Sequence, residues 1–384
     1  MILKPEKKPS NPYFSSGPCA KRPGWNFDIY SKAVLGRSHR SKIALSRIKE
    51  VIDLTKLLLE IPDNFYVGIV PGSDTGAIEM LLWTLLGEKP VEVLAWESFG
   101  NDWVKDIVNQ LKIPNTKVIE AKYGKIVNLN DINFKKDIVF TWNGTTSGVC
   151  VPNGDWIPNN REGLTICDAT SAAFSMRLPW EKLDATTFSW QKVLGGEAQH
   201  GVIILSPKAV HRLENFIPNR AIPKIFQLSN KGKINKKLFT GSTINTPSML
   251  CVEDALDALN WVKQAGGIEK TIELSKNNLL VVEKKIKNSQ WLDFLSEEES
   301  IRSCTSICLK IKDSILEKYE TEKLKEKMNN VFSFLEENKI AYDINSYRDA
   351  PIGIRIWGGA TVNENDIDIL IDWLEWCFIK FIRE

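Results

Sequence analysis

The sequence predicts an α/β protein, with a large, mostly parallel sheet covered by helices and a smaller α+β region at the carboxyl-terminal end. Three observations lead to this prediction. Short apolar runs alternate with helical stretches between residues 65 and 167, which is the pattern of strand–helix–strand units. After Gly266 and Gly267 the alternation gives way to long helices rich in Lys and Glu around two apolar runs. The length of 384 residues exceeds the ~250–300 residues at which a single core stops growing, so we expect two domains.

The expected division has three parts. Residues 1–16 form a loose arm that begins with polar, Lys- and Pro-rich sequence. Residues 17–267 form the large, cofactor-binding domain, and residues 268–384 form the small α+β domain. We place the boundary at the glycine pair because glycine is frequent where a helix ends.

The first elements follow from capping residues and periodicity. Ser41 can cap a helix that runs to about Ile61, with apolar residues on one face and Pro62 after it. A strand over Phe65–Val70 then leads through Pro71–Gly76 into a helix that reaches about Leu86. The next expected elements are strands over 91–96, 116–121, 137–142 and 164–167, and a helix over 102–111.

The pattern changes in the second half of the large domain. Strand-like runs over Thr186–Trp190 and Val202–Leu205 are joined by a glycine-rich turn. Thr246-Pro247 opens a helix, with Thr as a cap and Pro in the first turn, that ends near the glycine pair. The small domain contains strands over 306–311 and 353–357 and a closing amphipathic helix over 367–382.

Composition excludes several classes of function. The formal net charge is +2, which gives no reason to expect nucleic acid as a partner. No apolar run approaches the ~20 residues that span a bilayer, and no secretory signal is visible. The seven cysteines are scattered without a CxxC pair, so we expect neither a disulfide framework nor a metal site, and we expect a cytoplasmic protein.

Lys192 is a candidate for covalent chemistry. It lies in the glycine-rich turn between two apolar strands, where it can present its amine to a pocket. Desolvation lowers the pKa of a lysine and makes the amine nucleophilic, as carbonyl chemistry requires. The alternative is an ordinary surface hairpin lysine, which describes most lysines.

Asp168 stands 24 residues before Lys192, directly after an expected strand. Ligands of α/β sheets bind at the carboxyl ends of strands, so both residues can face one site. A carboxylate there can hold the pyridine nitrogen of pyridoxal 5′-phosphate protonated, which makes the ring an electron sink. An aspartate that only caps a turn is the competing interpretation.

Three further features fit the same cofactor. The turn that contains Ser73, Asp74 and Thr75 opens a helix, where N–H groups and the helix dipole favour a phosphate. Trp103 offers a flat ring for stacking. Asn245 and Thr246 precede a helix and offer a second phosphate contact. Each has a structural alternative: a helix start, a core tryptophan or a helix cap.

In this order the motifs resemble the class V aminotransferases, which have the pyridoxal-phosphate-dependent transferase fold type I, and among them the phosphoserine aminotransferases. The resemblance covers nearly the whole chain. The motifs that carry it are Phe14–Pro18, Ser38–Arg40, Asn143–Gly148, Asp168, Ser189–Lys192, Asn245–Pro247 and Gly353–Arg355.

The resemblance implies an activity and further roles. Glutamate would pass its amino group to 3-phosphohydroxypyruvate through a Schiff base on Lys192, in a homodimer with shared active sites. Asp168 would pair with the pyridine nitrogen. The other implied contacts are with the cofactor (Ser73, Asp74, Thr75, Trp103, Thr145, Gln191), with the cofactor phosphate of the neighbouring subunit (Asn245, Thr246) and with substrate (His39, Arg40, Arg355).

One position departs from the family pattern. Many members carry a basic residue in the glycine turn, where this chain has Asp74. A substrate phosphate would then need positive charge from elsewhere, with Lys21 and Arg22 as candidates beside the cluster from Arg37 to Arg40.

Other functions remain open from the sequence. A class V enzyme of the alanine–glyoxylate or serine–pyruvate type would use the same lysine, although its substrates lack a distal phosphate. A cysteine desulfurase would need a mobile cysteine, and Cys304 and Cys308 lie in or beside an expected buried strand. A cofactor-binding protein without catalysis would not need Arg355.

Overall fold

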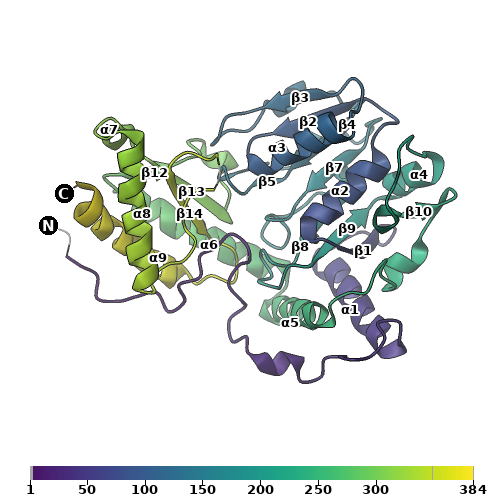
Figure 1. The fold of residues 1–384 in the computed structure, drawn as a ribbon, viewed down its shortest axis with the longest axis horizontal. Helices are drawn as coiled ribbons and strands as arrows, with labels where there is room; N and C mark the ends of the chain where they lie inside the picture. The colour runs from purple at the N-terminus through teal and green to yellow at the C-terminus, as the bar shows by residue number, and fades with distance from the viewer. Residues whose placement is uncertain (1–2, 348, 384) are drawn as a thin grey trace.

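The computed structural model describes residues 3–347 and 349–383. Within this part of the chain, seven strands form one large sheet in the order β1-β9-β8-β7-β4-β2-β3 (Figure 1). β9 runs antiparallel to both of its neighbours, and the other pairs in the sheet are parallel. The predicted α/β fold with a mostly parallel sheet is confirmed. The large sheet consists of β1 (Tyr66–Pro71), β2 (Val91–Ala95), β3 (Lys117–Glu120), β4 (Asp137–Thr141), β7 (Thr165–Asp168), β8 (Ala185–Ser189) and β9 (His200–Leu205).

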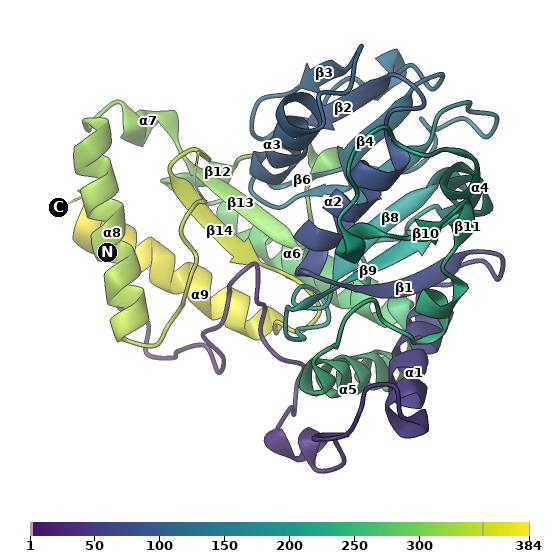
Figure 2. The ribbon, with the colours of Figure 1, turned by 45° about the vertical axis from the view of Figure 1, so that its right-hand side comes forward.

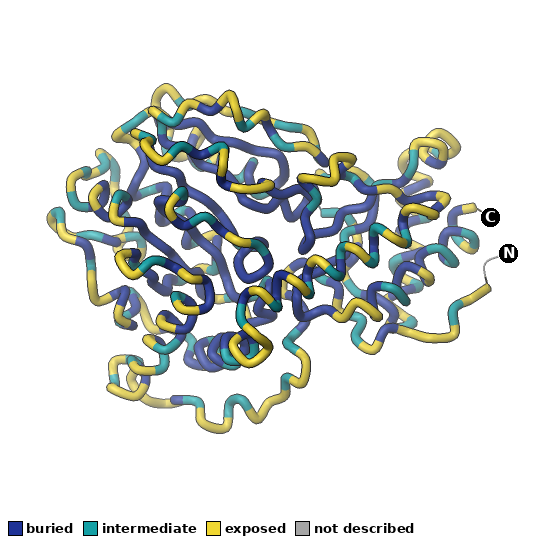
Figure 3. The backbone as a smooth tube through the Cα atoms, turned by 180° about the vertical axis from the view of Figure 1, so that it is seen from behind, coloured by how far each residue is buried: buried dark blue, intermediate teal, exposed yellow. Residues whose placement is uncertain are grey.

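Helices cover both faces of this sheet because side chains on each strand alternate between two cores. On β4, Ile138 and Phe140 face one core and Val139 faces the other. Figure 3 shows the strands buried inside a more exposed outer layer. The helices of the large part are α1 (Lys42–Leu58), α2 (Ser73–Leu85), α3 (Ser98–Lys105), α4 (Pro207–Asn215) and α5 (Met249–Ala265).

A smaller antiparallel sheet lies beside the large one, with helices packed around it (Figure 2). The core on one face of the large sheet continues without a break into this second sheet. The domain boundary at residue 267 therefore stays a prediction, although the helix that precedes it does end at Gly266. The smaller part contains α6 (Ile268–Ile286), β12 (Leu292–Phe294), β13 (Ser306–Ile311), α7 (Asp313–Leu316), α8 (Thr321–Glu337), β14 (Gly353–Trp357) and α9 (Glu364–Cys377).

Two short hairpins lie outside the two larger sheets. They pair β5 (Asn143–Gly144) with β6 (Val149–Cys150) and β10 (Ser229–Asn230) with β11 (Lys233–Ile234). In the part of the chain that the structure describes, no helix is both long enough and apolar enough to cross a membrane.

The expected loose arm is in fact tied to the far end of the chain. The Ser10 amide and hydroxyl donate to Asp366, and Tyr13 pairs with Tyr342. The Phe14 carbonyl accepts from the Trp357 amide at 3.0 Å. The sequence missed this because all of these partners lie more than 300 residues away.

The cap of α5 differs from the prediction. Ser248, and not Thr246, accepts the hydrogen bond from the Cys251 amide that caps this helix. Thr246 is exposed before the helix begins. Its hydroxyl is therefore not used as a cap. The predicted Ser41 cap on α1 is confirmed.

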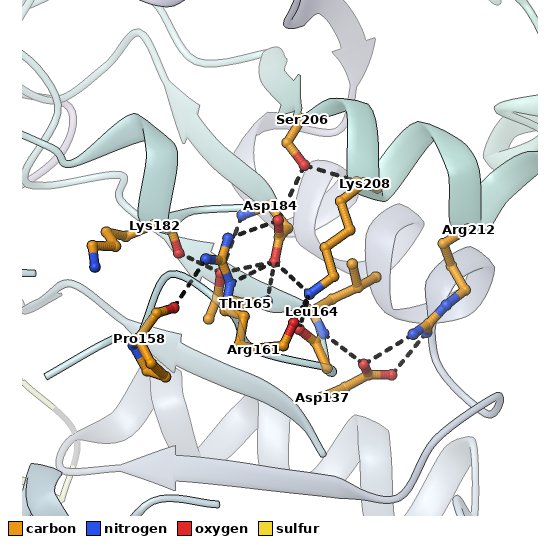
Figure 4. Close-up of polar contacts among 12 residues, drawn as sticks. Asp137, Pro158, Arg161, Leu164, Thr165, Lys182, Asp184, Ser206, Lys208 and Arg212 are labelled. Carbon is orange, nitrogen blue, oxygen red and sulfur yellow. Dashed lines mark hydrogen bonds and ion pairs between the residues drawn. The ribbon is translucent and has the colours of Figure 1, made fainter. Parts of the chain in front are cut away.

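A polar network fixes the ends of the strands opposite to the carboxyl ends of the parallel strands (Figure 4). Asp137 at the start of β4 accepts from both terminal nitrogens of Arg212, at 2.9 and 3.2 Å. Asp184, just before β8, accepts from Arg161 and from the Thr165 amide, at 2.8 to 3.0 Å. Both aspartates are buried, and their charges are balanced by arginines that are also buried.

Candidate active site

A cavity of about 190 Å³ lies at the carboxyl ends of the parallel strands. Thr141 and Asp168 are the last residues of β4 and β7, and Lys192 follows β8 in the next turn. The first turns of α2 and α3 complete the wall. The residues that line the cavity are Gly17, Ser73, Asp74, Thr75, Glu97, Phe99, Trp103, Thr141, Asn143, Thr145, Asp168, Thr170, Ser171, Gln191 and Lys192.

The amine of Lys192 is held inside this cavity by the N-terminal arm. Its Nζ donates a hydrogen bond to the Ser16 carbonyl. A Cβ on Gly17 would lie 2.6 Å from Nζ, so only glycine, here at φ +148°, leaves room for the amine. Burial lowers the pKa of Lys192, and the charge of Arg355 acts in the same direction. A larger fraction of the amine is therefore unprotonated and nucleophilic near neutral pH.

Asp168 is oriented by two N–H donors. Its Oδ2 accepts from Trp103 Nε1 at 3.2 Å, and its Oδ1 accepts from the Thr170 amide at 2.9 Å. The Trp103 side chain is buried in the cavity wall. One hydrogen bond thus fixes the ring plane of Trp103 relative to the Asp168 carboxylate.

Asp74 lies next to Asp168 and is also buried. Burial raises the pKa of Asp74 well above its usual value, and the negative charge of Asp168 raises it further. Its Oδ1 is buried without a hydrogen-bond partner. The chain thus places a second carboxyl group beside the one predicted to hold a pyridine nitrogen.

The turn before α2 is shaped for close approach of an anion. Gly72 and Ser73 both have positive φ, +87° and +53°. A Cβ on Gly201 would lie 2.2 Å from the Ser73 carbonyl oxygen, so β9 must pass this turn with a glycine. The first-turn N–H groups of α2 have no acceptor within the helix, and the helix dipole favours negative charge there.

Several polar atoms of the wall are buried without a partner. They include Thr141 Oγ1, Asn143 Oδ1, Thr170 Oγ1 and Gln191 Oε1. Buried polar groups in proteins are normally hydrogen-bonded, so this cluster indicates a polar ligand. An amine, a carboxylate, a flat indole and an anion-binding turn in one cavity fit pyridoxal phosphate.

Sequence reasoning missed Glu97, which caps α3 and ties it to a neighbouring loop. Its carboxylate accepts from the Gly100 amide at 2.7 Å and from the Thr146 hydroxyl at 3.0 Å. Burial raises the pKa of Glu97 to about 7. The available signal was a glutamate directly before the start of a helix that carries Trp103.

Sequence reasoning also missed an aromatic contact at the cavity edge. Phe99 from α3 stacks on Tyr347, with ring centroids 5.7 Å apart and planes 18° apart. The Arg355 guanidinium lies over the Tyr347 ring, 5.1 Å from its centroid. Arg355 Nε is buried without a partner. The smaller part of the chain therefore brings an arginine to the cavity that contains Lys192.

The remaining predicted residues divide into two groups. Thr145 and Gln191 line the cavity, as Ser73 and Thr75 do. The others lie elsewhere: Asn245, Thr246 and Arg40 are exposed and His39 is half-buried. Arg40 contacts Ser242 at 3.4 Å, so the two outer loops lie together on the surface.

Lys21 and Arg22 are committed to other partners. Lys21 pairs with Asp254 and Glu197, each at 2.8 Å. Arg22 donates to both oxygens of Asp257 at 2.6 Å. Acidic side chains thus balance the positive charges of Lys21 and Arg22, which the sequence suggested as an alternative site for a substrate phosphate.

Comparisons with known proteins were made at the levels of sequence and structure. No family model matches the chain. A phosphoserine aminotransferase from Methanosarcina mazei is 52% identical over 376 residues, which cover 98% of this chain and 99% of that protein.

Two solved structures share the fold at low sequence identity. A phosphoserine aminotransferase from Cytophaga hutchinsonii has a TM-score of 0.80 at 22% identity and covers 95% of this chain and 98% of its own. An alanine–glyoxylate aminotransferase from Nostoc has a TM-score of 0.79 at 16% identity and covers 98% of each chain. The fold alone does not separate these two activities.

Proposed function

This chain belongs to the phosphoserine aminotransferase family, and we propose that it transfers the amino group of glutamate to 3-phosphohydroxypyruvate, giving phosphoserine for serine biosynthesis. It is a transaminase that depends on pyridoxal phosphate. The observation that carries the proposal is the convergence of Lys192, Asp168, Trp103 and the turn before α2 on one cavity.

Lys192 has the central role in this proposal. It would hold the cofactor covalently until a substrate amine takes its place. Its freed Nζ, whose pKa burial lowers, would then accept the proton from the substrate Cα. The bound cofactor supplies an electron sink for the pair of electrons left on that carbon.

Asp168 and Trp103 would hold the ring. The Asp168 carboxylate would face the ring nitrogen and favour its protonated form. Ser73, Asp74, Thr75, Thr145 and Gln191 complete the proposed cofactor contacts. Arg355 would bind the substrate α-carboxylate, because a planar guanidinium matches a carboxylate through two parallel hydrogen bonds.

We propose a homodimer in which each active site uses two subunits. His39, Arg40, Asn245 and Thr246 lie on neighbouring surface loops and do not line the cavity of their own chain. From a second copy, Asn245 and Thr246 would reach the cofactor phosphate, and Arg40 and His39 the distal anionic group of the substrate. We also propose a cytoplasmic location, which seven unpaired cysteines support.

A mixing experiment tests the shared site. K192A and N245A are each expected to have little activity as pure proteins. Reassembly of an equal mixture should restore about a quarter of wild-type activity, because half of the random dimers would contain one intact site. No recovery in a mixture shown to exchange subunits would contradict the shared site.

Substrate choice is tested with the purified yellow protein. Phosphoserine, alanine and serine are each added without a keto acid, and the visible absorption of the bound cofactor is followed. We expect phosphoserine to bleach this band at a far lower concentration than the other two. Bleaching by alanine or serine, with none by phosphoserine, would overturn the proposed substrate and leave the roles of Lys192 and Asp168 intact.

A further inference from the structure

Asp74 and Asp168 form a buried pair of carboxyl groups in the wall of the cavity. Asp74 comes from the first turn of α2 and Asp168 from the end of β7, and both line the cavity. The two carboxyl groups are neighbours, close enough for the negative charge of Asp168 to act on Asp74. Only 6% of Asp74 and 8% of Asp168 are exposed, so water contributes little to the solvation of either group.

Two carboxylates in such contact do not both stay ionised. Repulsion between like charges, and the cost of burying them, favour a state in which the pair shares one proton. Lys192 contributes positive charge to the same region, but its amine is tied to the Ser16 carbonyl. The pair must therefore be treated as one acid with one tightly held proton.

The donors around the pair determine which residue holds this proton. Both oxygens of Asp168 accept from N–H groups, those of Trp103 and of the Thr170 backbone. An N–H group cannot accept a hydrogen bond, so a proton on either oxygen of Asp168 would find no acceptor in these contacts. The hydroxyls near Asp74, those of Thr187 and Thr170, are buried without a hydrogen-bond partner, and a hydroxyl can accept as well as donate. The proton therefore belongs on Asp74.

We propose that Asp74 is a positioning residue that stays protonated in the working enzyme and donates a hydrogen bond to Asp168. This bond fixes Asp168 so that it presents a single negative charge to the ring nitrogen of the cofactor. The inference rests on the proposed function, because it needs a pyridine ring in this cavity. It also explains how a carboxyl group can stand in an anion-binding turn, since a neutral acid does not repel a phosphate.

The charged and titratable neighbours of Asp74 come from three elements. Asp168 and Cys167 belong to β7, Lys192 follows β8, and His200 opens β9 opposite the end of β1. Burial raises the pKa of the Cys167 thiol and lowers that of His200 to about 4, so both are neutral near pH 7. Asp168 and Lys192 are then the groups whose charge acts on Asp74.

The first test is cofactor binding by the apoenzyme. The dissociation constant of pyridoxal phosphate is measured by tryptophan quenching from about pH 6 to about pH 10 for wild type, D74N and D74A. Asparagine can donate the same hydrogen bond, so we expect D74N to weaken binding by less than about threefold and D74A by at least about tenfold. Wild-type affinity should fall at high pH as Asp74 ionises, and D74N should lack this fall.

Two results would overturn the proposal. One is equal weakening in D74N and D74A, and the other is the same dependence on pH in wild type and D74N. If a variant does not fold, as judged by its melting curve, the wild-type protein still decides the matter through infrared spectroscopy. At about pH 8, a protonated carboxyl band should be present in the apoenzyme, and its absence would contradict the proposal.

A matched control assigns this band. Glu97 is the other cavity carboxyl group with a raised pKa, of about 7, and it is mostly ionised at about pH 8. E97Q should therefore keep the band and D74N should remove it. These measurements involve no amino-acid substrate, so a wrong substrate assignment would leave them unchanged.

Discussion

The two ends of the large sheet both bury aspartates, but they treat them in opposite ways. At one end, Asp137 and Asp184 have hydrogen bonds to both of their oxygens, largely from the buried Arg212 and Arg161 (Figure 4). At the other end, Asp74 has a buried oxygen without a partner and lies against a second carboxyl group. We call the first end saturated, because both oxygens of its two aspartates have hydrogen-bond partners. We call the second end unsaturated, because a buried carboxyl oxygen there has none.

The difference separates stability from function. A saturated polar network holds strands and helices in place, and nothing in it remains to bind a ligand. An unsaturated cavity costs folding free energy, and a ligand that supplies the missing partners regains it. Substitutions at the saturated end should therefore change unfolding alone, and substitutions at the cavity end should change chemistry, with or without an effect on unfolding.

The largest effect is expected for K192A. Removal of the only lysine among the cavity-lining residues should lower the transamination rate by at least about 10³-fold, because both covalent attachment and proton transfer are lost. Initial rates with phosphoserine and 2-oxoglutarate test this. The exposed Lys276 provides a control, and K276A should keep the wild-type rate. Turnover by K192A near the wild-type rate would contradict the role of Lys192 and, with it, the assignment of the cavity end to chemistry.

The next effect is expected at the saturated end. D137A should lower the free energy of unfolding by about 3–5 kcal/mol, because Arg212 loses a buried partner. The rate per folded molecule should not change. Urea unfolding and active-site titration measure the two quantities, with D63A at an exposed position as control. A fully stable but inactive D137A would show that this end also serves catalysis.

A smaller effect concerns Glu97 and pH. Its pKa rises from 4.5 to about 7 on folding, mainly through burial, so the folded chain binds this proton more tightly than the unfolded chain. Between these two pH values the unfolded chain loses the proton first, and the free energy of unfolding falls as pH rises. The total fall is of order 3 kcal/mol.

E97Q should remove this fall, so its stability relative to wild type should improve from about pH 4.5 to about pH 7. Urea unfolding across that range measures the difference, and E120Q at an exposed site is the control. A constant difference between E97Q and wild type would show that Glu97 does not keep its proton in the folded protein.

The smallest effect is expected for R355K. Lysine keeps the charge but loses the paired geometry, so KM for phosphoserine should rise about tenfold with a smaller change in kcat. R177K, at an exposed arginine, should leave both constants unchanged. A fall in kcat with an unchanged KM would show that Arg355 acts in a step of the reaction and not in substrate binding.

The sequence predicted part of the unsaturated end and nothing of the saturated end. Strand alternation placed Asp168 and Lys192 at the same edge of the sheet, because that edge follows from local pattern and chain direction. The Trp103–Asp168 hydrogen bond joins residues 65 positions apart, and local pattern does not show it.

Other contacts escaped the sequence for the same reason. Lys21 and Arg22 read as free basic residues because their partners, Asp254 and Asp257, lie more than 200 positions away. Asp74 read as part of a phosphate turn, whereas packing of α2 on the sheet puts its side chain against Asp168. The roles of Asn245 and Thr246 depend on a second chain and remain predictions.

The arm that holds Lys192 also sets an order in time. The Ser16 carbonyl accepts a hydrogen bond from Lys192. Two residues earlier in the arm, the Phe14 carbonyl accepts one from Trp357, near the other end of the chain. On the ribosome the arm emerges long before Trp357, and this anchor does not exist until Trp357 has been made. The large sheet can form earlier, but the arm's anchor beside Lys192 is completed only after that point. The contact that holds the Lys192 amine in place is therefore completed late, well after the lysine itself has been made.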